Sequence, residues 1–155
     1  VGLSYVFRWL SQRLKQRTAR QIERDRVVVE AFRKRLATPD FELVLRRFGA
    51  PISEPLRKLY SDLTTLNREC FAKTCRNNHH ESFFIAWYIP LDEQAYSEQW
   101  HCDDGRLDFA DDGTASRYTI DPTDDEAEIF YFRHEDQSLH PTGVRLSDFL
   151  ELPEA

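Results

Sequence analysis

The apolar positions in the first third of the chain recur with the period of a helix. They are spaced three, four or seven residues apart: Phe7, Leu10, Leu14, Ile22, Val29, Phe32 and Leu36. This spacing predicts a helix from Leu3 to Leu36. The stretch from Lys15 to Arg26 is polar nearly all round, so the helix is either long and partly exposed or split near Thr18.

Two shorter helices are predicted next. The run Thr38-Pro39-Asp40 ends the first helix, because proline restrains the residue before it, and a helix from about Asp40 to Phe48 follows. Gly49 is placed to end that helix with a left-handed cap. A third helix begins near Ser53, a favourable N-cap, and its apolar stripe consists of Leu56, Leu59, Leu63 and Leu66.

After about residue 80 the pattern becomes that of strands. Short runs rich in aromatic and β-branched residues predict strands at Ser82–Pro90, Leu107–Ala110, Arg117–Ile120 and Glu128–Arg133. A helical turn is expected around Asp92–Trp100 and a closing helix over Leu146–Leu152. This order predicts the α+β class, with N-terminal helices, a mostly antiparallel sheet and a C-terminal helix.

The chain is long enough for one buried core. It has 155 residues, of which 41% are apolar and 31% charged, a composition typical of globular proteins. The core is expected to contain Phe84, Trp87, Phe109, Tyr118, Phe130, Phe132, Phe149 and Leu150.

Charge is distributed unequally along the chain. Residues 1–58 hold fourteen Lys and Arg against six Asp and Glu, and residues 59–155 hold seven against twenty-one. The two parts therefore carry +8 and −14, which predicts a basic arm and an acidic body. We place the boundary at residue 40, with a basic helical segment over 1–40 and an α+β domain over 41–155.

The carboxylates of the acidic body are expected to lie in exposed turns, since aspartate beside glycine or proline favours turns. We expect a partner-binding face formed by Asp103, Asp104, Asp111, Asp112, Asp124, Asp125 and Glu126. Asp108 and Asp121 are also interpreted as turn formers on the acidic surface. No calcium loop fits, because a loop that begins at Asp108 has Ala110 at its third position where a ligand is needed. A surface that only confers solubility would use the same residues.

No metal site or catalytic site is predicted. The possible metal ligands are Cys75, His79, His80, His101, Cys102, His134 and His140, whereas structural zinc sites combine two closely spaced pairs. The sequence has no G-x-S-x-G motif and no glycine-rich phosphate loop, and a Cys102–His134 pair has no supporting motif. Three cysteines are too few for a disulfide framework and suit a reduced, cytoplasmic protein. We therefore expect no metal, no cofactor and no enzymatic activity.

The basic arm leaves three kinds of contact open. Its cations are Arg8, Arg13, Lys15, Arg17, Arg20, Arg24, Arg26, Arg33, Lys34 and Arg35. They suit the phosphates of a nucleic acid, but docking on the acidic body or on a protein partner explains them equally well. Arg8, Gln12 and Arg13 interrupt the apolar stretch Val1–Leu14, which is shorter than the roughly 20 residues of a membrane span. No membrane partner is expected.

Four segments of the chain resemble the SUKH superfamily, the Smi/Knr-like proteins. The run from Leu107 to Asp121 is similar to its block of two strands joined by an acidic glycine turn. The runs Ile129–Glu135 and Val144–Glu151 resemble its aromatic strand and its terminal helix. The run Phe48–Tyr60 is similar to the start of its first helix. The resemblance covers about residues 45–152.

The resemblance implies a non-enzymatic binding scaffold. Many bacterial members of this superfamily are immunity proteins that neutralise a toxin, and the family has no catalytic residue to transfer. Many such toxins are basic nucleases, so an acidic body would attract one and block its site. A protein that regulates nucleic acid through the basic helix is the alternative.

Overall fold

The computed structural model describes residues 2–65, 71–76, 82–99 and 104–151. The chain divides into two compact units, Val1–Lys34 and Arg35–Ala155. Nearly all of the first unit is one uninterrupted helix, α1 (Gly2–Leu36), so the split near Thr18 does not occur. The last two residues of α1 belong to the second unit, where Leu36 is fully buried.

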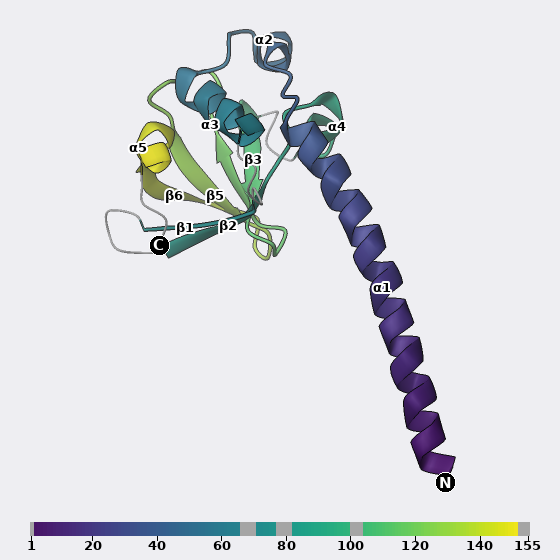
Figure 1. Cartoon of the computed structure of the whole chain (residues 1–155). Helices are drawn as coiled ribbons and strands as arrows, with labels where there is room; N and C mark the ends of the chain where they lie inside the picture. The colour runs from purple at the N-terminus through teal and green to yellow at the C-terminus, as the bar shows by residue number, and fades with distance from the viewer. Residues whose placement is uncertain (1, 66–70, 77–81, 100–103, 152–155) are drawn as a thin grey trace. The chain divides into compact units, whose positions relative to one another are not determined.

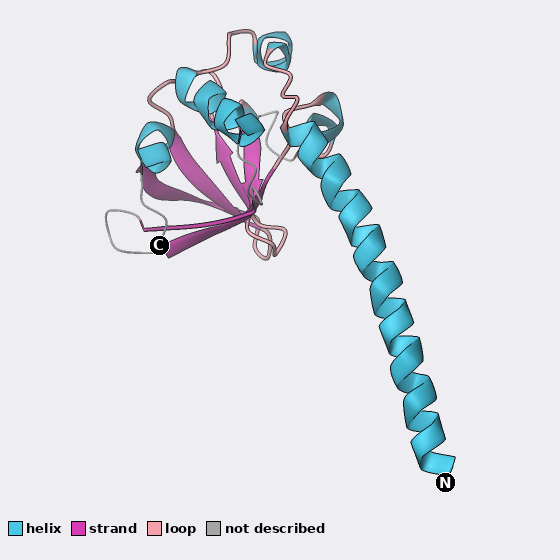
Figure 2. Cartoon of the chain, viewed as in Figure 1, coloured by secondary structure: helices cyan, strands magenta, loops and turns pink. Residues whose placement is uncertain are grey.

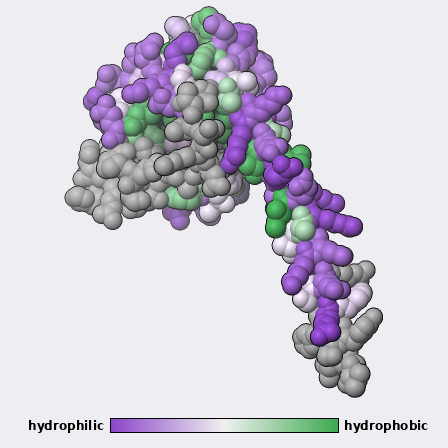
Figure 3. All heavy atoms as spheres, in the orientation of Figure 1, coloured by the Kyte–Doolittle hydropathy of each residue, from purple (hydrophilic) through white to green (hydrophobic). Residues whose placement is uncertain are grey.

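Ion pairs between side chains of α1 stabilise the exposed part of this helix. Its 35 residues correspond to a length of about 52 Å. Arg26 forms ion pairs with Glu23 at 2.8 Å and with Glu30 at 3.3 Å, each of which stabilises an exposed helix slightly. Most of the described side chains of α1 are hydrophilic (Figure 3), but Ile22 and Val28 are exposed apolar residues.

In its described residues, the second unit has a six-stranded antiparallel sheet and four helices (Figures 1 and 2). The helices are α2 (Glu42–Phe48), α3 (Glu54–Thr65), α4 (Glu93–Ser97) and α5 (Leu146–Glu151). The strands, in spatial order, are β1 (Phe71–Arg76), β2 (Ser82–Tyr88), β3 (Leu107–Asp111), β4 (Arg117–Ile120), β5 (Glu128–Arg133) and β6 (Ser138–Arg145). The predicted α+β class is therefore confirmed.

The predicted helix ends follow local chemistry. Gly49 ends α2 in the left-handed conformation with φ of 78°, and its N–H donates to the carbonyl of Leu45. The Ser53 hydroxyl accepts from the N–H of Leu56 at 3.3 Å, near the start of α3. Asp92 caps α4 by accepting from the N–H of Ala95 at 2.8 Å. Each cap satisfies a backbone group that the helix leaves without a partner.

Two strands were missed by the sequence analysis, β1 and β6. The segment of Cys75 forms the strand β1, although the pattern of the sequence predicts no strand before Ser82. The strand β6 contains Pro141 and Gly143, which read as turn residues. Proline is tolerated there because β6 is at the edge of the sheet, where one side of the strand has no ladder to complete.

The predicted core is correct in part. Phe109, Tyr118, Phe132 and Phe149 are buried, and Phe130 and Leu150 are half-buried. Two predictions are wrong, because Phe84 is 45% exposed and Trp87 is 38% exposed. Within the described residues, the strand β2 pairs with β3 at Trp87 and Tyr88. The rest of β2 has no strand partner on that side. The remaining core consists mainly of aliphatic residues from helices and sheet, including Leu36, Leu43, Leu56, Ile85, Leu107, Ile120, Ile129 and Leu146.

Candidate functional site

The expected partner-binding carboxylates do not form a single cluster. Asp111 and Asp112 lie where β3 turns into β4, whereas Asp124 to Glu126 lie where β4 turns into β5. The four residues of β4 separate these two turns by about 10 Å along the strand. Asp104 precedes β3 and belongs near the second turn, since Leu107 pairs with Ile120. Asp103 lies outside the described residues.

The β4–β5 turn is built by aspartate side chains. The Asp121 carboxylate accepts from the N–H and the hydroxyl of Thr123, at 3.0 and 2.8 Å. The Asp124 carboxylate accepts from the N–H of Glu126 at 2.9 Å. Aspartate is favoured in turns because its side chain accepts from the backbone two residues further on. The repeated spacing from Asp121 to Thr123 and from Asp124 to Glu126 is visible in the sequence.

Neighbouring elements hold this turn in place. The N–H of Ser53 donates to the carbonyl of Pro122 at 2.8 Å. The Asp125 carboxylate accepts from the N–H of Glu54 at the start of α3, at 2.9 Å, where a negative charge is favoured by the helix dipole. At the end of β6, Arg145 forms an ion pair with Glu126 at 2.6 Å. The turn is thus fixed to α3 and β6.

We name residues 121–126 the acidic turn. Its four carboxylates, those of Asp121, Asp124, Asp125 and Glu126, are all exposed. No lysine or arginine occurs from Asp121 to Glu128. Each aspartate uses one oxygen for the bonds above, and its charge still faces water. Asp121 belongs to this surface although the sequence analysis did not include it in the partner-binding set.

Asp111 does not lie on an exposed face, which corrects the prediction. It is 6% exposed and stands opposite Arg117 in the β3–β4 ladder, with 3.8 Å between its Oδ2 and the Nε of Arg117. Its Oδ1 accepts from the N–H of Gly113 at 2.7 Å. Burial raises the pKa of Asp111, while the Gly113 hydrogen bond and Arg117 act in the opposite direction.

Asp112 has a structural function in the same turn. It is half-buried, and its Oδ2 accepts from the Tyr131 hydroxyl at 2.7 Å. Its Oδ1 accepts from the N–H and the hydroxyl of Thr114, at 2.8 and 2.7 Å. Burial is the main cause of the raised pKa of Tyr131, and Asp112 adds to it. This carboxylate is therefore largely used within the fold.

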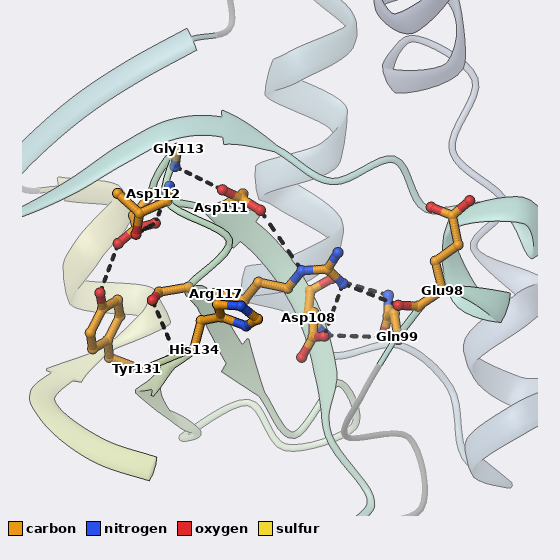
Figure 4. A network of polar contacts seen from close by, with 11 residues as sticks. Glu98, Gln99, Asp108, Asp111, Asp112, Gly113, Arg117, Tyr131 and His134 are labelled. Atoms are coloured by element: carbon orange, nitrogen blue, oxygen red, sulfur yellow. Dashed lines mark hydrogen bonds and ion pairs between the residues drawn. The ribbon is translucent and has the colours of Figure 1, made fainter. Parts of the chain in front are cut away.

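A polar network adjoins this turn inside the protein (Figure 4). Arg117 contacts the Oδ2 of Asp108 at 3.4 Å and donates to the Glu98 carbonyl at 3.3 Å. The side-chain amide of Gln99 pairs with the backbone N–H and carbonyl of Asp108, at 3.0 and 3.1 Å. Asp108 is fully buried, so its interpretation as a surface turn former is wrong. A register shift between Asp108 and Ala110 changes which side chains face inward.

The histidines and cysteines do not converge on a metal site in the part of the chain that is described. There, no group of three or more His, Cys, Asp or Glu is arranged to hold an ion. His134 and His140 are exposed, and the Nε2 of His140 lies 2.6 Å from the Ser138 hydroxyl. The other possible ligands His79, His80, His101 and Cys102 lie outside the described residues, so the Cys102–His134 pair has only His134 within them.

Comparisons with protein-family models, with curated proteins and with solved structures find no match to this chain. Among the helices of the described residues, none combines the length and the apolar character needed to cross a membrane.

Proposed function

We propose that this chain is a non-enzymatic protein-binding module of the SUKH type that acts in the cytoplasm. Its partner would be a basic protein, and an immunity protein that neutralises a basic, nuclease-type toxin fits the resemblance best. The recognising surface would be the acidic turn of the second unit.

The observation that carries this proposal is the exposure of the acidic turn. Four carboxylates within six residues are exposed, and one of them, that of Glu126, is paired with Arg145. The Pro122 carbonyl accepts from the N–H of Ser53, and the Asp125 carboxylate accepts from the N–H of Glu54, so the turn is held on α3. A fixed turn presents its charges in one arrangement, so little ordering entropy is lost when a partner binds. This combination supports specific recognition beyond mere solubility.

Electrostatic attraction would act mainly on the rate of association. A strongly acidic surface steers a basic partner toward the complex, and salt weakens this effect because the Debye length is only about 10 Å at 0.1 M. Carboxylates on a protein also resemble the phosphates that a nuclease binds. An acidic turn placed over such a site would exclude the nucleic acid.

The test is affinity capture from nuclease-treated lysate of the source cell at low salt. The baits are the unchanged chain and the variant D121N/D124N/D125N, in which asparagine keeps the oxygen that accepts the turn hydrogen bonds and removes the charge. We expect the unchanged chain to retain a basic protein that the variant loses. Association of the purified pair should then be slower in the variant and less dependent on salt.

The control variant is E42Q/E98Q/E135Q, which removes three exposed charges from other parts of the second unit. It should retain the partner. Equal capture by all three baits, or equal loss in both variants, would show that the acidic turn is not the recognising surface.

A further inference from the structure

The first half of α1 differs in charge from the rest of the molecule. Residues 1–22 contain no aspartate or glutamate. Arg8, Lys15 and Arg20 are the cations of this stretch whose side chains are described, and all three are exposed. The first acidic residue, Glu23, is paired with Arg26 at 2.8 Å. No acidic residue earlier in the helix is present to neutralise the three cations, so their charge is available to an anionic partner.

The three cations border a polar face of the helix. Because α1 is one uninterrupted helix from Gly2, successive residues are separated by about 100° around its axis. Lys15 and Arg20 are then about 140° apart, and Arg8 lies beside Lys15. The exposed side chains of Gln12 and Gln16 fall between these two borders, with Trp9 close to Gln16 in direction. We name this set the Gln12 face, which consists of Arg8, Trp9, Gln12, Lys15, Gln16 and Arg20.

The described side chains in this half of α1 do not form an apolar stripe. Trp9 is the large apolar residue that is described there, and it is 49% exposed among the polar residues of the Gln12 face. The next exposed apolar residue, Ile22, lies about 140° away from Trp9 around the helix. A bilayer surface or a second helix contacts a continuous apolar stripe. The Gln12 face offers cations and amide groups instead, which suit phosphates and the edges of bases.

We propose that the Gln12 face of α1 lies in the major groove of duplex DNA. Arg8 and Lys15 would contact the phosphates of one strand and Arg20 those of the other. Gln12 and Gln16 would form hydrogen bonds with base edges between them. An α-helix with a diameter of about 10–12 Å fits a major groove that is about 12 Å wide. The proposal concerns the first unit and does not depend on the acidic turn.

The two cationic borders favour a DNA duplex over other nucleic acids. A single strand offers one line of phosphates, which one border would satisfy, whereas the groove of a duplex has phosphates on both sides. The major groove of duplex RNA is too deep and narrow for side chains to reach the bases. The amides of Gln12 and Gln16 can both donate and accept, as the base edges in the major groove of DNA require.

The charge of the second unit limits the affinity. Residues Arg35–Ala155 contain twelve Lys and Arg against twenty-four Asp and Glu, a net charge of −12. This charge repels phosphates at long range. We therefore expect binding at low salt, and we expect it to weaken as salt rises because each phosphate contact releases counterions.

The experiment measures the fluorescence anisotropy of a labelled DNA duplex of roughly 20 base pairs with the full chain, between about 50 and 200 mM salt. R8Q/K15Q/R20Q removes the three cations of the Gln12 face, and R24Q/R33Q/K34Q removes three other exposed cations of α1. The slope of log affinity against log salt should decrease by about 2.7 in the first variant, at roughly 0.9 for each phosphate contact, and by less than about 1 in the second. Equal decreases would show that only total charge matters, which overturns the proposal.

A second pair of variants tests the middle of the Gln12 face. Q12E/Q16E places two negative charges between the cationic borders, and T18E/Q21E places the same charge at exposed positions on the opposite side of the helix. The affinity for the duplex should fall about tenfold or more in Q12E/Q16E and at most about threefold in T18E/Q21E. Equal losses would contradict the proposed orientation. Circular dichroism checks that the variants stay helical, since glutamine and glutamate favour helices.

Three further probes compare the DNA duplex with its alternatives. They are single-stranded DNA of the same length, duplex RNA, and vesicles of phosphatidylcholine containing roughly 30% phosphatidylglycerol. We expect the DNA duplex to bind more tightly than each of them. The proposal is also overturned if the duplex is not bound at about 50 mM salt, or if one of the three probes binds as tightly as the duplex.

Discussion

The aspartates of this chain have different functions that depend on their surroundings. Asp121 and Asp124 are exposed and shape a turn through hydrogen bonds to backbone N–H groups. Asp108 is fully buried beside Arg117, and Asp111 is buried with a raised pKa. Residue type and neighbours in sequence are similar in all four cases. Whether the charge faces water depends on strand pairing and on the segment that covers each residue.

At the residue scale, the two phenylalanines of β5 should differ in their contribution to stability. Phe132 is buried, so Phe132→Ala should lower the free energy of unfolding by about 3–5 kcal/mol. Phe130 is half-buried beneath the guanidinium of Arg106, which lies 4.7 Å from the ring centroid. Phe130→Ala should cost only about 1–2 kcal/mol. Urea denaturation measures both values, and equal losses would contradict this ranking.

A pH dependence is expected from Asp92. Its pKa is lowered chiefly by the hydrogen bond from Arg35, whose Nε lies 2.8 Å from its Oδ2. A lowered pKa in the folded state stabilises the protein above the unfolded value of about 3.9, and this contribution is lost as pH falls through the folded value. The unchanged chain should therefore lose more stability than Asp92→Asn between neutral and acidic pH. Denaturation curves at several pH values measure this difference, and parallel losses would exclude a stabilising charge at this position.

At the element scale, the turns are fixed by backbone conformation as well as by aspartate. Gly113, with φ of 88°, lies so close to β2 that an added Cβ would be 3.3 Å from the Cβ of Ala86. Gly49, with φ of 78°, has open space around it. Both positions favour glycine because a left-handed backbone strains other residues. The turn at Gly113 has a packing constraint in addition.

The two glycines provide a matched pair of variants. Gly49→Ala should lower the free energy of unfolding by about 1 kcal/mol, the cost of the left-handed conformation. Gly113→Ala should lower it by roughly 2–3 kcal/mol, because the methyl group also presses on Ala86. Thermal and urea unfolding of the two variants test this order. A larger loss at Gly49 would show that the contact with β2 is unimportant.

Elements with a clear hydrophobic period could be identified from the sequence. The helix α2 and its Gly49 cap, the strand β4 and the strand β5 were found at nearly their observed bounds. The strand β6 could not be identified in this way, because proline and glycine, here Pro141 and Gly143, are typical of turns. Its pairing with β5 and the bond from the Thr142 hydroxyl to the Ile129 carbonyl at 2.7 Å are contacts with a distant segment. Local propensity does not contain that information.

At the scale of the whole molecule, charge and compactness divide the chain at nearly the same place. The unit Val1–Lys34 contains nine Lys and Arg against three Asp and Glu, a net charge of +6. The second unit, Arg35–Ala155, contains the sheet, the core and the acidic turn. The boundary predicted from the sequence, residue 40, lies next to Pro39. In the structure the second unit begins earlier, at Arg35, and includes Leu36. Leu36 is the point at which the helix enters the core.

Removal of residues 1–20 should leave the stability of the second unit unchanged. The residues of its core begin at Leu36 among those that are described, so the deletion removes no core side chain. The urea midpoint of the shortened chain should match that of the full chain to within about 0.5 kcal/mol. A clear decrease would mean that the basic helix supports the fold of the second unit.

The sequence by itself determined the class of the fold, the types of most elements and the exposure of the acidic turn. These depend on local period and on hydrogen bonds over two or three residues. Only the tertiary structure decided that Asp108 and Asp111 are buried and that Phe84 and Trp87 are exposed. Asp108 lies at a register shift in β3, Asp111 stands opposite Arg117 in the β3–β4 ladder, and Phe84 lies in the part of β2 that is not paired with β3. Burial depends on what packs across the sheet from far along the chain, and a side chain's own hydropathy cannot specify it.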